Sequence, residues 1–399
     1  MKATYVPRDI EKELLAATRQ FPVLVLTGAR QTGKSTLLKH LFPQVAYASL
    51  DDPFIRQAAQ EDPRSFLLQA PRLVVDEIQH LPELLPHIKV LVDADRRNAG
   101  RFLLTGSQIF PLMAGLGESL AGRAAIYHLL PFSHRELGNQ TLSIPRCFQR
   151  IFDGFYPDVA VHGVDRNRFF SSYVQTYLER DIRLMTAVHD LKLFQNLIGL
   201  LAARIGNLLN FNELAKEAGI SAATVRRWVS LLETTGLLVL LRPYSGNLSK
   251  RIVKSPKLYF GDTGLAAWLL RYPTAESLRH GPQSGALFEN LVLLECLKHK
   301  ANFGAPGELF FYRDSNHNEI DLVIASGSAT RLVEIKQTAT PKATHFDTIR
   351  RLLPLFPHPQ AFVALASPKE ERLAANLAAL PWPQIAGRVF GQPAKRNSA

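Results

Sequence analysis

The chain is poor in cysteine. Only two of its 399 residues are cysteines, Cys147 and Cys296, which is too few for a disulfide or zinc framework and favours a reducing, cytoplasmic setting. It also lacks any run of about 18 apolar residues, so we expect no membrane span. The opening residues, Met1 to Arg8, are not followed by the apolar segment of a signal peptide. We therefore expect a cytoplasmic protein with no membrane partner.

Acidic residues are also scarce relative to basic ones. The chain has 47 Lys and Arg against 35 Asp and Glu, which gives a formal net charge of +12 and a pI near 9.7. This balance favours a polyanionic partner, most simply DNA, and solubility alone is the alternative explanation. A length of 399 residues is too great for one ordinary core and indicates two to three domains.

A glycine-rich motif stands near the N-terminus. Residues Gly28–Thr36 read GARQTGKST and fit G-x-x-x-x-G-K-[ST] in full. The apolar run Val23–Leu26 predicts a strand before the motif, and a helix is expected after it. This context is typical of a phosphate loop that binds ATP and Mg²⁺, with Lys34 near the β- and γ-phosphates and Ser35 as a metal ligand. The expected nucleotide-binding residues are Gly28, Ala29, Arg30, Gln31, Thr32, Gly33, Lys34, Ser35 and Thr36.

Two adjacent carboxylates follow a second apolar run. Residues Arg72–Val75 predict a buried strand that ends at Asp76 and Glu77, where ligands lie in open α/β sheets. We expect Asp76 to hold Mg²⁺ together with Ser35. Glu77 is the candidate general base that activates the attacking water.

Two further elements offer catalytic candidates. A further strand over Phe102–Gln108 is expected to end in small polar groups, and Ser107 or Gln108 is a candidate to reach the γ-phosphate or the water. Arg123 is the candidate that stabilises charge on the transferred phosphoryl group, in cis or from a neighbouring subunit.

These motifs resemble one family. Together with Gln79, they resemble AAA+-type ATPases of bacteria and archaea, and the wording of the phosphate loop resembles the family called AAA_14/DUF4143. Two later stretches, Gly154–Pro157 and Tyr173–Asp181, match it as well. The resemblance covers nearly the whole chain and implies an AAA+-like core that assembles as a homo-oligomer, in a ring or other multimer.

The middle of the chain predicts a winged helix. Residues 212–218 and 221–229 read as two helices with a tight turn at Gly219, and strands are expected at Leu237–Pro243 and Leu258–Phe260. Residues 161–257 hold 14 Lys and Arg against 7 Asp and Glu, a net charge of +7. We expect DNA here, with a protein partner as the alternative. The candidate DNA-contacting residues are Thr224, Arg226, Arg227, Lys250, Arg251 and Lys254, and Lys257 is assigned to the same basic wing.

Four polar residues of the last third follow an ordered pattern. Glu289 lies in a predicted helix, Asp321 in one strand, and Glu334 and Lys336 in the next, where a period of two puts them on one face. This arrangement resembles the PD-(D/E)xK nuclease fold. Such a set can hold a second divalent metal, Mg²⁺ or Mn²⁺, at a scissile phosphate. The fold also occurs as a DNA-binding or structural module, so cleavage stays open.

The predicted fold class is α/β, in three domains. A P-loop AAA+-like ATPase domain is expected at 1–165, a helical linker and winged helix at 166–275, an α/β nuclease-like domain at 276–390 and a disordered tail at 391–399. The expected function is an ATP-hydrolysing, DNA-binding machine of repair, recombination or defence. Two alternatives remain, a nucleotide-controlled switch with protein partners and an ATP-dependent nuclease.

Overall fold

The computed structural model describes residues 5–106, 119–138, 143–178, 191–245, 253–367 and 369–391. The chain forms two compact units. One comprises residues 1–132 with 234–236 and 301–304, and the other comprises residues 133–233, 237–300 and 305–399. Among the helices of the described ranges, none is both long and apolar enough to cross a bilayer.

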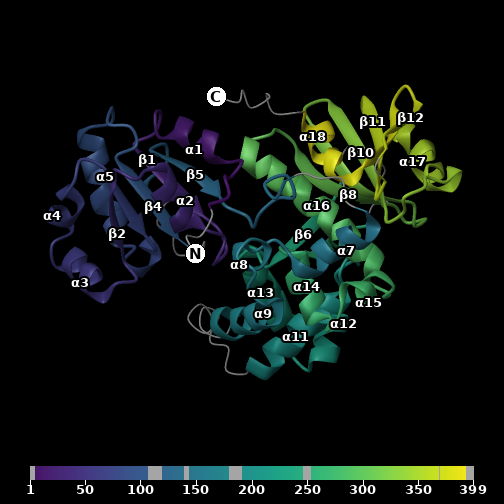
Figure 1. The fold of residues 1–399 in the computed structure, drawn as a ribbon, viewed down its shortest axis with the longest axis horizontal. Helices are drawn as coiled ribbons and strands as arrows, with labels where there is room; N and C mark the ends of the chain where they lie inside the picture. The colour runs from purple at the N-terminus through teal and green to yellow at the C-terminus, as the bar shows by residue number, and fades with distance from the viewer. Residues whose placement is uncertain are drawn as a thin grey trace. The chain divides into compact units, whose positions relative to one another are not determined.

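The first unit is built on a parallel sheet of five strands, in the order β2-β3-β4-β1-β5 (Figure 1). Its strands are β1 (Val23–Thr27), β2 (Ala46–Ser49), β3 (Leu73–Asp76), β4 (Phe102–Gly106) and β5 (Ala124–His128). Its helices are α1 (Glu11–Ala17), α2 (Lys34–Leu41), α3 (Pro53–Glu61), α4 (Pro63–Leu68), the 3₁₀ turn η1 (Ile78–His80) and α5 (Leu84–Ala94). The strand, glycine loop and helix expected around the motif are confirmed.

Helices cover both faces of this sheet. Val23 and Val25 of β1 lie in one apolar cluster with Ile88 of α5. Leu24 and Leu26 lie in the other cluster, with residues of α1 and α2. Because alternate side chains of a strand point to opposite faces, a strand buried on both sides reads as an unbroken apolar run. This burial explains the sequence of β1.

The second unit contains a mixed sheet of eight strands, in the order β12-β13-β11-β10-β9-β8-β6-β7. The strands are β6 (Leu238–Pro243), β7 (Lys257–Phe260), β8 (Glu308–Arg313), β9 (Glu319–Ser326), β10 (Ala329–Lys336), β11 (Pro359–Leu365), β12 (Glu371–Ala374) and β13 (Leu377–Pro381). The expected strands of the wing, β6 and β7, pair antiparallel. Strand β6 also pairs with β8 through Arg242 and Pro243, so this sheet runs across the boundary predicted between residues 275 and 276.

The helices of the second unit include the expected pair around Gly219. Helix α12 (Phe211–Ala218) ends at Gly219 in a left-handed conformation, and α13 (Ala222–Thr234) follows. The Ser221 Oγ accepts a hydrogen bond from the Thr224 N–H at 3.1 Å and so caps α13. The other helices are α7 (Ile144–Asp153), α8 (Pro157–Ala160), α9 (Arg166–Tyr173) with the π-helical η2 (Val174–Leu178), α11 (Leu191–Ala203), α14 (Thr263–Leu269), α15 (Ala275–Arg279), α16 (Ser284–Phe303), η3 (Ala343–His345), α17 (Asp347–Leu352), η4 (Leu353–Leu355), η5 (Trp382–Gln384) and α18 (Ile385–Phe390).

Strand β7 forms one edge of this sheet, and its outer side is covered. The Asn290 side chain of α16 accepts from the Phe260 N–H and donates to the Phe260 carbonyl, both at 2.9 Å. The Leu258 N–H donates to the Asn207 carbonyl at 3.0 Å. These bonds satisfy backbone groups that an open edge would expose.

The family-like stretch Gly154–Pro157 has a structural role. Gly154 ends α7 with φ 80° and ψ −165°, a conformation that is essentially restricted to glycine. A Cβ on Gly154 would overlap Oδ1 of the buried Asp262 and lie 3.0 Å from the Gly264 Cα. Oδ2 of Asp262 accepts from the Phe155 N–H at 2.8 Å, which ties this turn to α14. The stretch therefore marks a backbone-to-backbone contact within the second unit.

We predict that Gly154→Ala lowers the free energy of unfolding by about 3 kcal/mol or more, because the change adds a clash to an unfavourable φ. The matched control is Gly163→Ala, where φ is also positive (+68°) but a Cβ would meet nothing within 4 Å. The control is expected to cost about 1–2 kcal/mol. Urea denaturation followed by circular dichroism measures both, and equal losses would contradict the role of the contact.

Candidate functional site

The glycine loop between β1 and α2 adopts the backbone that the motif predicts. Gly28 has φ +149° and Gly33 has φ +92°, and Gln31 is also left-handed at φ +61°. A Cβ on Gly28 would overlap the carbonyl oxygen of Leu129. Glycine is therefore required at this position by the neighbouring backbone, and at Gly33 by the conformation itself.

Arg8 supports this loop, although the sequence offered no motif to reveal it. Arg8 is 3% exposed, and its guanidinium donates to the Thr32 carbonyl at 3.0 Å and to the Leu130 carbonyl at 2.6 Å. The Thr32 hydroxyl in turn donates to the Ala29 carbonyl at 2.9 Å. The loop is thus held from the N-terminal segment as well as from its own residues.

Lys34 begins α2 and folds back over the loop. Its Nζ donates to the carbonyls of Gly28 and Ala29, both at 3.0 Å. Burial lowers the pKa of Lys34 to about 8, against the opposing effect of the Glu77 and Asp76 carboxylates. The expected cation therefore lies inside the loop.

Asp76 receives three hydroxyl groups at the carboxyl end of β3. The Ser35 Oγ lies 3.0 and 2.9 Å from its two carboxylate oxygens, and Tyr47 and Thr105 also donate to it. Burial, followed by the hydrogen bond to Asp76, raises the pKa of Tyr47. A serine hydroxyl beside a carboxylate is a donor set that Mg²⁺ accepts, so Ser35 and Asp76 fit the expected metal.

Glu77 follows Asp76 with a left-handed backbone, φ +55°. Its N–H donates to the Thr105 Oγ1 at 3.1 Å, and the Gln79 side-chain amide donates to its carboxylate. A non-glycine residue in this conformation is uncommon and is often found at functional sites. Thr105 thus bridges both members of the carboxylate pair.

Three polar groups near the loop were not assigned a role from the sequence. Tyr47 and Thr105 stand on β2 and β4, the strands on either side of β3, so hydroxyl side chains on the strands that neighbour the Asp76 strand were the available signal. His128 ends β5, and its Nδ1 lies 3.2 Å from the Thr27 Oγ1. Burial, reinforced by the charge of Lys34, lowers the pKa of His128 to about 4. His128 is therefore neutral at pH 7.

Arg123 is not brought to the loop of its own chain. It precedes β5, whose first residue pairs with Val23 at the start of β1, whereas the loop follows the end of β1 roughly 13 Å away. Its guanidinium forms a two-bond pair with Asp93 of α5, at 2.7 and 2.9 Å. A role in cis is not supported by this position, and a role in trans stays a prediction.

Some expected residues lie outside the described ranges. These are Ser107, Gln108, Lys250 and Arg251, together with residues 179–181 of the family-like stretch Tyr173–Asp181 and residues 392–399 of the expected tail. Of the other candidates for DNA contact, Arg226, Arg227 and Lys254 are exposed and Thr224 is half-buried. Arg226 also lies 4.5 Å from the ring centroid of Phe211. The described arginines of α13 thus face solvent.

The four residues of the nuclease-like set are gathered at one place in the second unit. The Lys336 Nζ lies 2.6 Å from the Glu334 Oε1, and Oδ2 of Asp321 accepts from the Ile335 N–H at 2.8 Å. Burial, followed by the charge of Asp321, raises the pKa of Glu334 to about 8 and that of Glu289 to about 7. The expected geometry of helix, strand and strand is therefore present.

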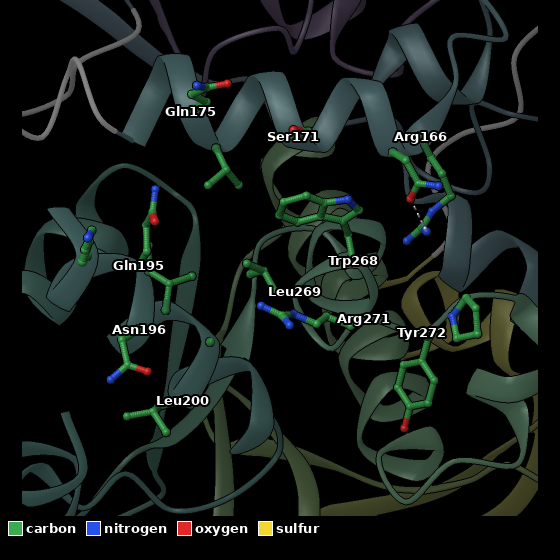
Figure 2. Close-up of a pocket in the computed structure, with 16 residues that line it drawn as sticks. Arg166, Ser171, Gln175, Gln195, Asn196, Leu200, Trp268, Leu269, Arg271 and Tyr272 are labelled. Carbon is green, nitrogen blue, oxygen red and sulfur yellow. Dashed lines mark hydrogen bonds between the residues drawn. The ribbon is translucent and has the colours of Figure 1, made fainter.

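A hollow of about 900 Å³ lies among α9, η2, α11 and the end of α14 (Figure 2). Figure 2 shows Trp268 and Arg271 on one side, with Gln195 and Asn196 of α11 on another. Arg166 and Lys192 add two more basic side chains, and none of the described lining residues is acidic. This lining suits a ligand that carries negative charge.

We predict that Thr105→Val lowers kcat for ATP about tenfold to a hundredfold, because leaving a buried partner unpaired costs about 1–3 kcal/mol. Thr105→Ser retains the hydroxyl and is expected to keep most of the activity. Phosphate release under saturating ATP and Mg²⁺ measures both variants. A Thr105→Val protein as active as the wild type would show that the bridge to Asp76 and Glu77 has no catalytic effect.

Comparisons with known proteins assign a family to the unit that holds the phosphate loop. A family model described as "AAA domain" (AAA_14) matches residues 20–138, and two models of domains of unknown function match residues 145–276 (DUF8612) and 284–385 (DUF4143). The uncharacterized protein Rv2008c of Mycobacterium tuberculosis is 32% identical over 337 residues, covering 84% of this chain and 74% of the relative. The uncharacterized protein Mb2031c of Mycobacterium bovis matches with the same figures.

Among solved structures, the Walker-type ATPase PABY2304 of Pyrococcus abyssi aligns with a TM-score of 0.43 at 16% identity, covering 66% of this chain and 95% of that one. DnaA from Aquifex aeolicus aligns with a TM-score of 0.30 at 13% identity, covering 56% and 85%. At such scores the likeness adds no conclusion about function. The family match and the phosphate-loop geometry lead to the assignment: this chain belongs to the AAA_14/DUF4143 family, and its N-terminal unit is a P-loop ATPase domain of the AAA type.

Proposed function

We propose that this protein hydrolyses ATP in its N-terminal unit and uses the cycle to act on DNA through its second unit, as a multimer in repair, recombination or defence. One observation carries the first part. Lys34, Ser35, Asp76 and Glu77 converge at the carboxyl end of one parallel sheet, around a loop with the required backbone.

The loop residues bind and orient the nucleotide. Backbone N–H groups of Gly28–Thr36 receive the phosphates, and the ammonium of Lys34 exchanges its two loop carbonyls for phosphate oxygens. Ser35 and Asp76 hold Mg²⁺, which neutralises phosphate charge when bound. Tyr47 and Thr105 orient the Asp76 carboxylate for that task.

Glu77 accepts the proton of the attacking water. Its backbone is positioned by Thr105, and its carboxylate is oriented by the Gln79 amide. Ser107, which follows β4, remains a candidate for contact with the γ-phosphate. Arg123 would act only in trans, on a neighbouring subunit, after release from Asp93.

We predict that Glu77→Gln lowers kcat by about 10²–10⁴-fold while ATP still binds, because only the general base is lost. Lys34→Ala is the matched variant in the same site and is expected to lose ATP binding itself. Binding of a fluorescent ATP analogue and phosphate release separate the two effects. Wild-type turnover in Lys34→Ala would reject the assignment of the site.

The DNA proposal is supported mainly by α13. This second helix of the pair around Gly219 presents Arg226 and Arg227 to solvent, and the segment 161–257 carries a net charge of +7. The hollow beside Trp268 is also lined by basic side chains, which contribute positive charge to the same unit. Arginines of this kind contact phosphates, so the affinity is expected to depend strongly on salt and weakly on sequence.

We predict that Arg226→Glu with Arg227→Glu weakens binding to duplex DNA at least tenfold and reduces the slope of log K against log salt by about two. The control is Arg350→Glu with Arg351→Glu on α17, an adjacent exposed pair that makes the same charge change. Fluorescence anisotropy at several salt concentrations measures both. No binding by the wild type at low salt would reject DNA and favour the switch with protein partners.

A further inference from the structure

The carboxylates of the nuclease-like set surround a lysine that the sequence placed elsewhere. Lys257 begins β7 and was expected on a basic wing that faces DNA, but its side chain is only 4% exposed. Inside the second unit its ammonium meets carboxylates of α16 and β9. The expectation for Lys257 is therefore wrong.

The Lys257 ammonium lies among three carboxylates. Its Nζ is 2.9 Å from the Glu289 Oε1 and 3.9 Å from the Asp321 Oδ1, and it forms a third ion pair with Glu319. The Tyr259 hydroxyl, two residues along β7, also donates to Glu289. Glu289 and Asp321 are two of the four residues on which the metal expectation rested.

Several other acceptor atoms of the cluster are occupied, whereas the Glu334 Oε2 is buried without a hydrogen-bond partner in the described part of the chain. Oδ2 of Asp321 accepts the Ile335 N–H, Glu334 pairs with Lys336, and Arg313 lies 3.2 Å from the Glu319 Oε2. The cluster thus combines four carboxylates with three protein cations, Lys257, Arg313 and Lys336. Most of its negative charge is balanced by the chain itself.

A divalent metal does not fit this arrangement. Mg²⁺ requires about six oxygen ligands at 2.0–2.1 Å in near-octahedral geometry, and an ammonium beside Glu289 and Asp321 repels it from that space. Among the described residues, no group of three or more His, Cys, Asp and Glu side chains has the geometry to hold a metal ion.

We propose that Lys257 takes the place of the divalent cation in this nuclease-like site, so that the second unit neither binds a catalytic metal nor cuts DNA. The cluster instead ties β7 to α16 and β9 by charge. This inference does not depend on ATP hydrolysis, and it favours the DNA-binding machine over the ATP-dependent nuclease.

The test is Mn²⁺ binding by the full-length protein without nucleotide or DNA, followed by electron paramagnetic resonance. Every sample carries Asp76→Asn, which removes the carboxylate ligand of the N-terminal metal site. With Lys257 in place, we expect no binding that depends on Asp321. Lys257→Met should gain one Mn²⁺ site, whose affinity is at least tenfold higher than that of any Mn²⁺ binding by the protein that keeps Lys257. Lys257→Met combined with Asp321→Asn should lose this site.

Two controls keep the outcome decisive. Lys257→Arg retains the charge and is expected to gain no site. Because Lys257→Met removes ion pairs and is expected to be less stable, its melting temperature is also measured, and Mn²⁺ should raise it without changing that of the Lys257 protein.

The proposal is overturned by Mn²⁺ binding to the Lys257 protein that Asp321→Asn abolishes. It is also overturned by a folded Lys257→Met protein that gains no site. Nicking of supercoiled plasmid by the Lys257 protein in Mn²⁺, lost in Asp321→Asn, would overturn it as well. If Lys257→Met does not fold even with Mn²⁺, the proposal is judged from the protein that keeps Lys257 alone. Its Mn²⁺ binding and plasmid nicking, each compared with Asp321→Asn, then give the answer.

Discussion

The nucleotide site depends on the Asp76 carboxylate and the hydroxyls that hold it. Ser35 comes from the helix after the glycine loop, Tyr47 from β2 and Thr105 from β4, and all three donate to a residue at the end of β3. One buried acid therefore links the phosphate loop to three adjacent strands. Because Thr105 also accepts the Glu77 N–H, the candidate base is positioned by the same network. Because a buried polar group without a partner is costly in a low-dielectric interior, such a network stabilises the site only when each member is hydrogen-bonded.

Carboxylates are also buried in the second unit, but there the groups that surround them are positively charged. Its buried carboxylates also need compensating groups, and the chain supplies Lys257, Lys336 and Arg313. In the N-terminal unit, hydroxyl groups surround Asp76 and leave its negative charge available to a cation. In the second unit, ammonium and guanidinium groups pair with the carboxylates and balance their negative charge. The two acidic sites of this protein therefore differ in the kind of partner that surrounds them.

Much of the candidate site could be predicted because its signals are local. The glycine loop with Lys34 and Ser35 lies within nine consecutive residues, and Asp76 and Glu77 directly follow an apolar run. The helices around Gly219 were predictable for the same reason. Arg8, Tyr47 and His128 were not, since each acts through a partner that is distant in the chain. Arg123 had a suitable residue type, but the parallel register of β1 and β5 places it at the far end of the sheet.

The sequence by itself determined the ATPase domain, its strand, loop and helix, and the residue types of both acidic clusters, because periodicity and short motifs are properties of neighbouring residues. Only the tertiary structure decided which charges meet. Lys257 reads as one more basic residue on a wing, yet the pairing of β6 with β8 and the cover of β7 by α16 bring its ammonium to Glu289, Glu319 and Asp321. The contacts of a charged side chain follow from packing between elements far apart in the chain, and no local pattern encodes that packing.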